Sequence, residues 1–154
     1  MKLNTLIIDD EKLSRDILEI LILEHCPEIN IISKCASAYE ARLLIETKKI
    51  DLVFLDIAMP IENGFDFLDS IPNRKLSVIF ITAYNQFALN AIKANALDYI
   101  LKPIDFNELK LSVKKAMYAF SNSIKDLNID NILNQVKSNS KNVSNLSVLV
   151  NGEY

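Results

Sequence analysis

Carboxylates, a hydroxyl and an ammonium stand at the ends of short apolar runs along this chain. Asp9 and Asp10 follow "LNTLII", Asp56 follows "DLVFL", Thr82 ends "LSVIFIT" and Lys102 follows "ALDYIL". In an open sheet of parallel strands, ligands bind beyond the carboxyl ends of the strands, where the strand order reverses. If the first and third runs are neighbouring strands, we expect the three carboxylates to converge in one crevice.

Such a cluster of carboxylates predicts a bound cation. Like charges a few ångströms apart in a partly dry site repel one another, so either one carboxyl group protonates or a cation neutralises the set. The three acids offer oxygen ligands only, with neither His nor Cys among them. Oxygen donors of this kind favour Mg²⁺, which keeps waters that a phosphate group replaces.

The other two groups indicate a reaction at Asp56. The ammonium of Lys102 and the hydroxyl of Thr82 would hold phosphoryl oxygens while the Asp56 carboxylate attacks phosphorus and forms an acyl phosphate. Each residue also has a simpler interpretation. Asp9 and Asp10 would be an N-cap pair, Asp56 a turn residue, Thr82 a β-branched strand residue and Lys102 a solvated loop residue.

The elements that must position these groups alternate between strand and helix. Apolar runs of strand length cover residues 3–9, 29–35, 51–56, 76–82 and 96–101. Helical spacing of apolar residues covers residues 12–24, 38–48, 65–70, 86–95 and 106–120. This alternation predicts an α/β fold with a doubly wound, five-stranded parallel sheet.

The expected domain organisation follows from a change in amino-acid composition after residue 120. We expect one domain over residues 1–120 and a linker over 121–145, rich in Ser, Asn and Lys, with one weak helical turn over 129–136. Residues 146–154, "LSVLVNGEY", resume the alternation of a strand, which cannot bury a face alone. They indicate the start of a truncated output domain, or a tail.

The composition argues against several classes of protein. The chain has 154 residues, half of them hydrophobic, and a formal net charge of −3, so its bulk charge favours neither nucleic acid nor an acidic membrane. No apolar run approaches the length of a membrane span, and the first run is too short for a signal peptide. We therefore expect a cytoplasmic protein without a membrane partner.

Four motifs, in this order, resemble the receiver domain of bacterial two-component response regulators: "LIIDDE", "FLDIAMPIENGFDFL", "VIFITAY" and "DYILKPID". The resemblance covers residues 3–120 and implies a flavodoxin-like (βα)5 fold. It implies that Asp56 accepts a phosphoryl group from a sensor histidine kinase, with Mg²⁺ as the cofactor. Such a domain is not an enzyme in the usual sense, because it catalyses only its own phosphorylation and dephosphorylation.

The resemblance also assigns roles to individual residues. Asp10 and Asp56 would bind Mg²⁺ directly, together with the backbone carbonyl of Ala58, and Asp9 would bind it through water. Thr82 and Lys102 would contact the phosphoryl group.

Further residues would support the site or transmit its state. The peptide bond from Lys102 to Pro103 would be cis, as it usually is in this family. Tyr99 would turn inward as Thr82 moves toward the phosphate, although its simplest role is packing. Gly64 would serve the backbone geometry after the "MPIEN" turn. The face formed by residues 85–120 would rearrange and form a homodimer, or else be a solvated surface.

The output and the chemistry leave alternatives. The segment from "DYILKPID" to "LSVLVNGEY" is similar to regulators with a LytTR-type DNA-binding domain, which would be mostly absent here, so that DNA would be bound only through it. A stand-alone receiver that acts by protein contact is the alternative. A Mg²⁺-dependent phosphohydrolase with an aspartyl-phosphate intermediate is disfavoured, because Ala58 stands where such enzymes carry a second acid. Ala58 and Tyr84 are also apolar or aromatic where many receivers have polar groups, which predicts a long-lived phosphoryl group.

Overall fold

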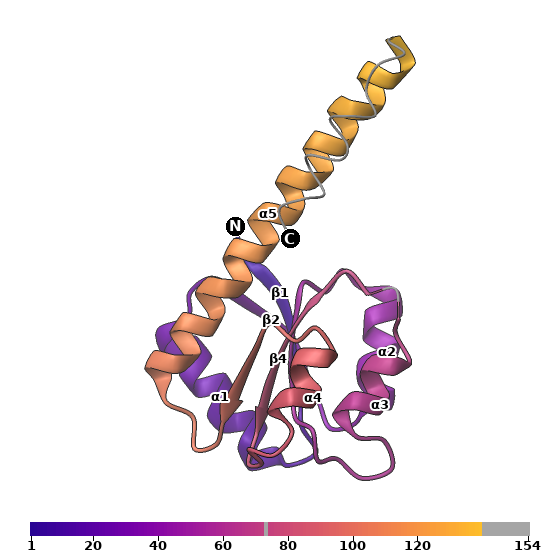
Figure 1. Cartoon of the computed structure of the whole chain (residues 1–154). Helices are drawn as coiled ribbons and strands as arrows, with labels where there is room; N and C mark the ends of the chain where they lie inside the picture. The colour runs from indigo at the N-terminus through magenta and orange to yellow at the C-terminus, as the bar shows by residue number, and fades with distance from the viewer. Residues whose placement is uncertain (73, 140–154) are drawn as a thin grey trace. The chain divides into compact units, whose positions relative to one another are not determined.

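The computed structural model of the chain describes residues 1–72 and 74–139 (Figure 1). Strands and helices alternate along the described residues, and the predicted α/β fold is confirmed. The elements are β1 (Leu3–Ile8), α1 (Lys12–His25), β2 (Ile29–Cys35), α2 (Ala38–Thr47), β3 (Leu52–Leu55), α3 (Gly64–Asp69), β4 (Ser77–Thr82), α4 (Ala88–Lys93), β5 (Asp98–Leu101) and α5 (Phe106–Asn139).

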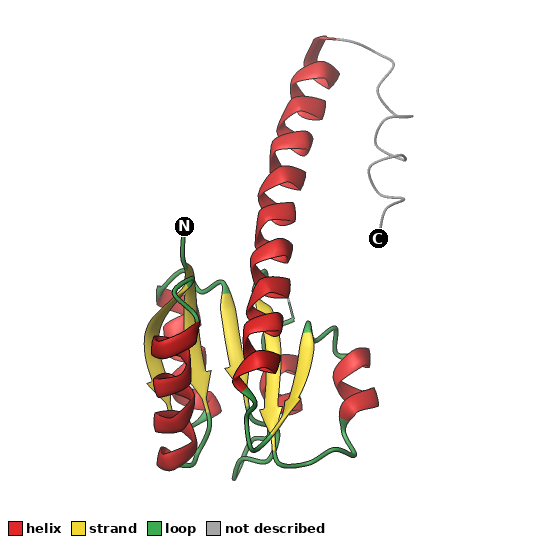
Figure 2. Ribbon diagram, turned by 90° about the vertical axis from the view of Figure 1, so that its left-hand side faces the viewer, coloured by secondary structure: helices red, strands yellow, loops and turns green. Residues whose placement is uncertain are grey.

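The strands form one parallel sheet in the order β2-β1-β3-β4-β5, drawn in yellow in Figure 2. The chain runs outward from β1 to β2 and then returns to β3 on the other side of β1, so the strand order reverses between β1 and β3. Ile8 lies opposite Leu55 in the register of this pair. The residues that follow these two strands therefore come to the same edge of the sheet, at the position where ligands bind in folds of this kind.

Apolar side chains fill the space on both faces of the sheet. Almost every residue of β1, β3 and β4 is buried, as expected for parallel strands that helices cover on both sides. In Figure 1, α1 and the first turns of α5 lie on one side of the sheet, and α2 and α3 lie on the other. The rings of Phe54, Phe67 and Phe80 are fully buried in this core. Such dense packing fixes the strand ends that carry the polar groups.

The segment from residue 121 is helical as far as Asn139, where only one weak helical turn was expected, because α5 continues through it. The weak helical turn expected over residues 129–136 is part of this longer helix. Two features explain the difference. Neither proline nor glycine occurs between Pro103 and Gly152 to end a helix. Phe120, Ile124 and Leu127 also follow one another at helical spacing.

The other predicted bounds differ from the observed ones by at most two residues, which is the usual uncertainty at element ends. The chain divides into two compact units, Met1–Met117 and Tyr118–Tyr154, which are described separately. The strand expected over residues 146–154 lies outside the described residues. Among the helices of the described part, none is both long and apolar enough to cross a membrane.

Candidate functional site

Asp9, Asp10 and Asp56 lie together at the carboxyl ends of β1 and β3. One carboxylate oxygen of each residue lies within 4.8 Å of the others. Two backbone hydrogen bonds hold the strand ends in this arrangement. The N–H of Asp56 donates to the carbonyl of Ile8 at 3.0 Å, and the N–H of Asp9 donates to the carbonyl of Cys35 at 3.0 Å. The convergence of the three acids, expected from the sequence, is present in the structure.

This donor set fits a hard divalent cation. All three side chains offer carboxylate oxygens, the ligands that Mg²⁺ prefers. Among the buried side-chain polar atoms of the described residues, Oδ1 of Asp10 has no hydrogen-bond partner. A buried carboxylate oxygen without a partner is costly unless a cation binds it. The unpaired oxygen of Asp10 is therefore independent support for a metal site at this edge.

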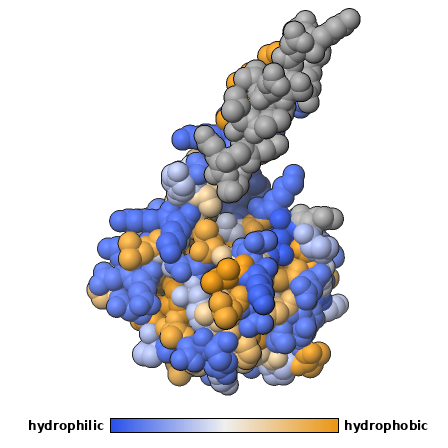
Figure 3. Space-filling view, viewed as in Figure 1, coloured by the Kyte–Doolittle hydropathy of each residue, from blue (hydrophilic) through white to orange (hydrophobic). Residues whose placement is uncertain are grey.

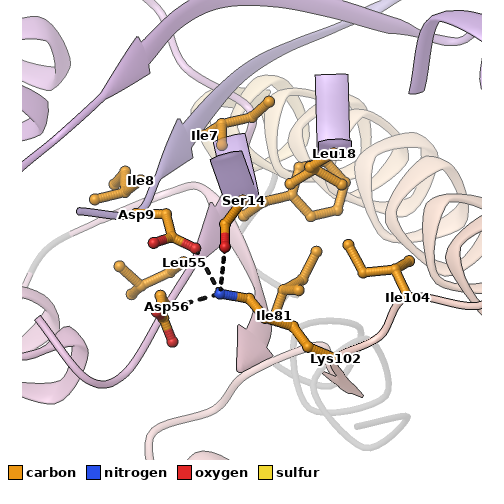
Figure 4. Close-up of a pocket in the computed structure, with 11 residues that line it drawn as sticks. Ile7, Ile8, Asp9, Ser14, Leu18, Leu55, Asp56, Ile81, Lys102 and Ile104 are labelled. Atoms are coloured by element: carbon orange, nitrogen blue, oxygen red, sulfur yellow. Dashed lines mark hydrogen bonds and ion pairs between the residues drawn. The ribbon is translucent and has the colours of Figure 1, made fainter. Parts of the chain in front are cut away.

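Lys102 follows β5 and reaches across the sheet edge to two of these acids (Figure 4). Its Nζ lies 2.7 Å from Oδ2 of Asp9 and 3.5 Å from Oδ2 of Asp56. Burial lowers the pKa of Lys102, but the Asp9 and Asp56 carboxylates outweigh burial, and the net shift is upward. The side chain therefore carries a positive charge at neutral pH.

The Asp56 carboxylate has a distinct role for each oxygen. Oδ1 accepts a hydrogen bond from the N–H of Ile57 at 2.8 Å, and Oδ2 faces Lys102. Burial raises the pKa of Asp56 and outweighs the lowering by the Lys102 ammonium and the Thr82 hydroxyl, while the charge of Asp9 adds to the increase. A partly desolvated carboxylate of this kind is typical of functional sites and is suited to nucleophilic chemistry.

Asp9 also divides its two oxygens between two partners. Oδ1 accepts from the N–H of Glu11 at 2.9 Å, and Oδ2 accepts from Lys102. Glu11 is the N-cap residue of α1, and its own side chain makes no capping hydrogen bond. The simpler interpretation of Asp9 and Asp10 as an N-cap pair was therefore wrong, because Glu11 is the N-cap and the backbone N–H that donates to the Asp9 carboxylate is that of the same residue.

The residues expected to transmit the state of the site are connected through the backbone of Tyr84. Oγ1 of Thr82, which is fully buried, accepts from the N–H of Tyr84 at 3.4 Å. The hydroxyl of Tyr99 donates to the carbonyl of Tyr84, and the ring of Tyr99 contacts Phe80 with 6.3 Å between centroids. A change at Thr82 would therefore reach Tyr99 through one residue.

The remaining expected residues surround the acids. Ala58 lies in the loop between β3 and α3 with an exposed side chain. The peptide bond between Lys102 and Pro103 is cis, as expected from the resemblance. Gly64 is the buried first residue of α3, and its N–H donates to the carbonyl of Ile57 at 2.9 Å.

Two residues of α1 contact the site and were not predicted from the sequence. Oγ of Ser14 lies 3.2 Å from Nζ of Lys102, and Nη1 of Arg15 donates to the backbone carbonyl of Asp9 at 2.7 Å. The available signal was their position in the first turn of α1, which begins two residues after Asp10.

The sheet order, the acidic cluster and the lysine before a cis proline define a flavodoxin-like domain with an acidic site at its switch point. The chain belongs to the response regulator receiver domain family, whose model matches residues 5–114. It is therefore a domain of two-component signalling.

Curated relatives of this chain include response regulatory and sensory transduction proteins. It is 40% identical over 116 residues to an uncharacterized response regulatory protein of Vibrio cholerae, covering 75% of this chain and 48% of the relative. It is 38% identical over 116 residues to the sensory transduction protein LytT of Enterococcus faecalis, covering 74% of this chain and 48% of that protein. The chain thus spans about half the length of these relatives.

Solved structures of receiver domains have the same fold. The response regulatory domain of protein mrkE from Klebsiella pneumoniae aligns with a TM-score of 0.71 at 28% identity, over 77% of this chain and 98% of that one. The response regulator TrrA from Thermotoga maritima, solved in complex with Mg(2+)-BeF, aligns with a TM-score of 0.65 at 31% identity, over 75% of this chain and 99% of that one.

Proposed function

We propose that Asp56 accepts a phosphoryl group from a sensor histidine kinase and that the modified domain changes the activity of an output domain. One observation carries this proposal. Three carboxylates and the Nζ of Lys102 meet at the switch point of the sheet, and Nζ lies 3.5 Å from Oδ2 of Asp56. Membership in the receiver family, whose model matches residues 5–114, supports the same reaction.

The chain's own residues would hold the cofactor. Asp10 and Asp56 would bind Mg²⁺ directly with the backbone carbonyl of Ala58, and Asp9 would bind it through water. The unpaired Oδ1 of Asp10 supports this assignment. When bound, the ion would neutralise charge on the acids and on the phosphoryl oxygens.

The transfer would be a direct displacement at phosphorus. A carboxylate oxygen of Asp56 attacks, the new O–P bond forms an acyl phosphate, and the N–P bond of the donor phosphohistidine breaks. The donor imidazole leaves with the bonding electron pair and takes up a proton. Lys102 and Thr82 would hold the phosphoryl oxygens, because an ammonium and a hydroxyl both donate hydrogen bonds to them.

The state of Asp56 would reach the surface through Thr82 and Tyr99. Movement of Thr82 toward a phosphoryl group would disturb its contact with the N–H of Tyr84, whose carbonyl accepts from Tyr99. The structure thus has Thr82 and Tyr99 both bonded to the backbone of Tyr84. Phosphorylation would favour a second arrangement, in which these bonds are broken.

Residues 85–117, the part of the expected 85–120 face that lies in the first compact unit, would form a homodimer in the phosphorylated protein. Leu89 and Ile92 of α4 are 72% and 69% exposed, and Leu101 of β5 and Leu111 of α5 are exposed as well. Figure 3 shows apolar atoms exposed over α4.

The oligomeric state tests this dimer. With beryllium fluoride as a phosphoryl mimic, light scattering should give a dimer for the parent protein and a monomer for Ile92→Glu. The matched control is Leu43→Glu, because Leu43 is an exposed residue of α2.

The output is proposed from relatives alone. Relatives at 35% to 40% identity include the sensory transduction protein LytT and the transcriptional regulatory protein BtsR. We therefore propose that this domain controls a LytTR-type DNA-binding domain and, through it, transcription. DNA would be bound only by that output domain. The division into residues 1–120, a connecting segment and residues 146–154 stays a prediction, with the connecting segment helical as far as Asn139.

The other expectations from the sequence stay predictions. A stand-alone receiver would act by protein contact alone. A phosphohydrolase is less consistent with the site, because Ala58 offers no acid two residues after Asp56. The long phosphoryl lifetime and the cytoplasmic location also stay predictions.

The decisive experiment locates the phosphoryl group. The protein is incubated with acetyl phosphate and Mg²⁺, digested, and analysed by mass spectrometry. We expect the modification on Asp56, absent in Asp56→Asn and retained in Asp69→Asn, whose acid is exposed on α3. Modification elsewhere would contradict the proposal, and steady release of phosphate with many turnovers would favour the phosphohydrolase.

A further inference from the structure

Ser14 is the one neutral side chain that contacts the ammonium of Lys102 at the described site. It is the third residue of α1, and its Oγ lies 3.2 Å from Nζ of Lys102. Figure 4 shows Asp9, Asp56 and Ser14 approaching Nζ, from the ends of β1 and β3 and from the first turn of α1. An ammonium has three N–H donors, and these three oxygens match them in number.

The rest of the pocket gives Nζ no alternative partner of this kind. The side chains that line it beyond these four residues are apolar: Ile7, Ile8, Leu18, Leu55, Ile81 and Ile104 among them. Lys102 lines the pocket together with these apolar side chains. Within the part of the chain that the structure describes, its Nζ meets side-chain oxygens of Asp9, Asp56 and Ser14. Removing one of the three oxygens would therefore leave one N–H donor without its partner.

The carboxylates of Asp9 and Asp56 have other proposed roles in the reaction, whereas the Ser14 hydroxyl has none. Asp9 and Asp56 are the residues proposed to hold the cation and the phosphoryl group, so their oxygens are shared during transfer. Ser14 is uncharged, offers no carboxylate to a cation, and lies in the first turn of α1. Its hydroxyl is thus an acceptor that stays available to Lys102 while the carboxylates engage other groups.

We propose that Ser14 is a positioning residue for Lys102: its hydroxyl keeps Nζ at the site so that the ammonium meets the phosphoryl oxygens during transfer to Asp56. This inference rests on the proposed function, since it assigns Ser14 a role in that same reaction. Ser14 acts through Lys102 and does not itself touch the reacting atoms.

The kinetic test uses acetyl phosphate at saturating Mg²⁺ and follows the rate at which Asp56 is modified. We expect Ser14→Ala to lower this rate roughly tenfold, the order expected for one hydrogen bond to a charged group. Ser14→Thr keeps the hydroxyl and should stay within about twofold of the parent protein. Ser14→Val has the shape of threonine but lacks the hydroxyl, so its rate should resemble that of Ser14→Ala.

A double-mutant cycle separates positioning from general damage. In the Lys102→Ala background, Ser14→Ala should cause no further loss of rate, because the residue through which Ser14 acts is gone. A loss that persists in this background, or a Ser14→Ala protein that is modified at the parent rate, would overturn the inference. Thermal unfolding of each variant checks that the domain is folded.

A second measurement needs neither the cation nor phosphorylation. In the metal-free protein, NMR of ¹⁵N-labelled lysine should show the Nζ signal of Lys102 protected from hydrogen exchange. Ser14→Ala and Ser14→Val should exchange faster than the parent and Ser14→Thr, and equal exchange in all four would overturn the inference. If the parent protein is never modified on Asp56, the proposed function fails, whereas the NMR comparison still decides whether Ser14 holds Lys102.

Discussion

Gly64 lies so close to Asp56 that a side chain at position 64 would collide with the backbone of the acid. A Cβ atom built on Gly64 would stand 2.6 Å from the carbonyl oxygen of Asp56 and 3.2 Å from Cα of Ile57. Both neighbours are backbone atoms at the end of a buried strand, and they cannot move without moving the site. Close approach, and not a left-handed conformation, explains glycine here, because no described glycine has positive φ.

Gly64→Ala should destabilise the domain by about 1–3 kcal/mol, the usual cost of overpacking a buried position. Urea unfolding would measure the change. Asp69→Ala, an exposed change in the same helix, should stay within about 0.5 kcal/mol of the parent protein. Equal stability of Gly64→Ala and the parent would show that α3 and the Asp56 backbone separate easily.

Mg²⁺ should stabilise the folded domain, because only the folded chain gathers the three acids. At a free concentration of about 100 times Kd, the gain in the free energy of unfolding should be about 2.7 kcal/mol. Asp10→Asn should lose most of this gain, because it removes the charge of the carboxylate that carries the unpaired Oδ1. Asp69→Asn should keep it, and an equal response of the two variants in thermal unfolding would argue against the site.

Asp56→Asn should stabilise the metal-free protein at neutral pH. Burial raises the pKa of Asp56 above its ordinary value of 3.8, despite the opposing effect of Lys102, so the ionised carboxylate is less favourable in the folded than in the unfolded chain. The stabilising effect of a raised pKa is present below 3.8 and is lost as the pH rises through the folded-state value.

The gain from asparagine should therefore be absent below pH 3.8 and complete above the raised pKa. Thermal unfolding in EDTA at several pH values would measure it, with Asp69→Asn as the control. A difference between Asp56→Asn and the parent that does not vary with pH would rule out this origin.

Ile61 and Asn95 form a natural pair for testing backbone strain. They are the described non-glycine residues with positive φ, at 69° and 60°. The side chain of Ile61 is fully exposed, so little burial compensates for a β-branched residue in this conformation. Ile61→Asn should stabilise the protein by about 1 kcal/mol, and Asn95→Ile should destabilise it by a similar amount, as measured by urea unfolding. Destabilisation by both changes would show that Ile61 makes a contact that outweighs its strain.

Local pattern was sufficient for most elements and insufficient for the last one. Strand and helix positions follow from the spacing of apolar residues, and spacing depends on neighbours along the chain. The polar composition of residues 121–139 suggested a linker, although the lack of helix-ending residues and the spacing of Ile124 and Leu127 favoured continuation of α5. In this segment the helical spacing of apolar residues, and not the polar composition, agrees with the observed structure.

The groups that stand at strand ends can be identified from the sequence, because an apolar run that stops at Asp56, Thr82 or Lys102 shows where a buried strand meets water. The contacts between these groups depend on the folded chain. Lys102 contacts Asp9 across 93 positions of the chain, and Ser14 joins them because the first turn of α1 returns to the same edge. Such contacts depend on the order of the strands and on the packing of a helix against them. The spacing of residues along one segment specifies neither of these.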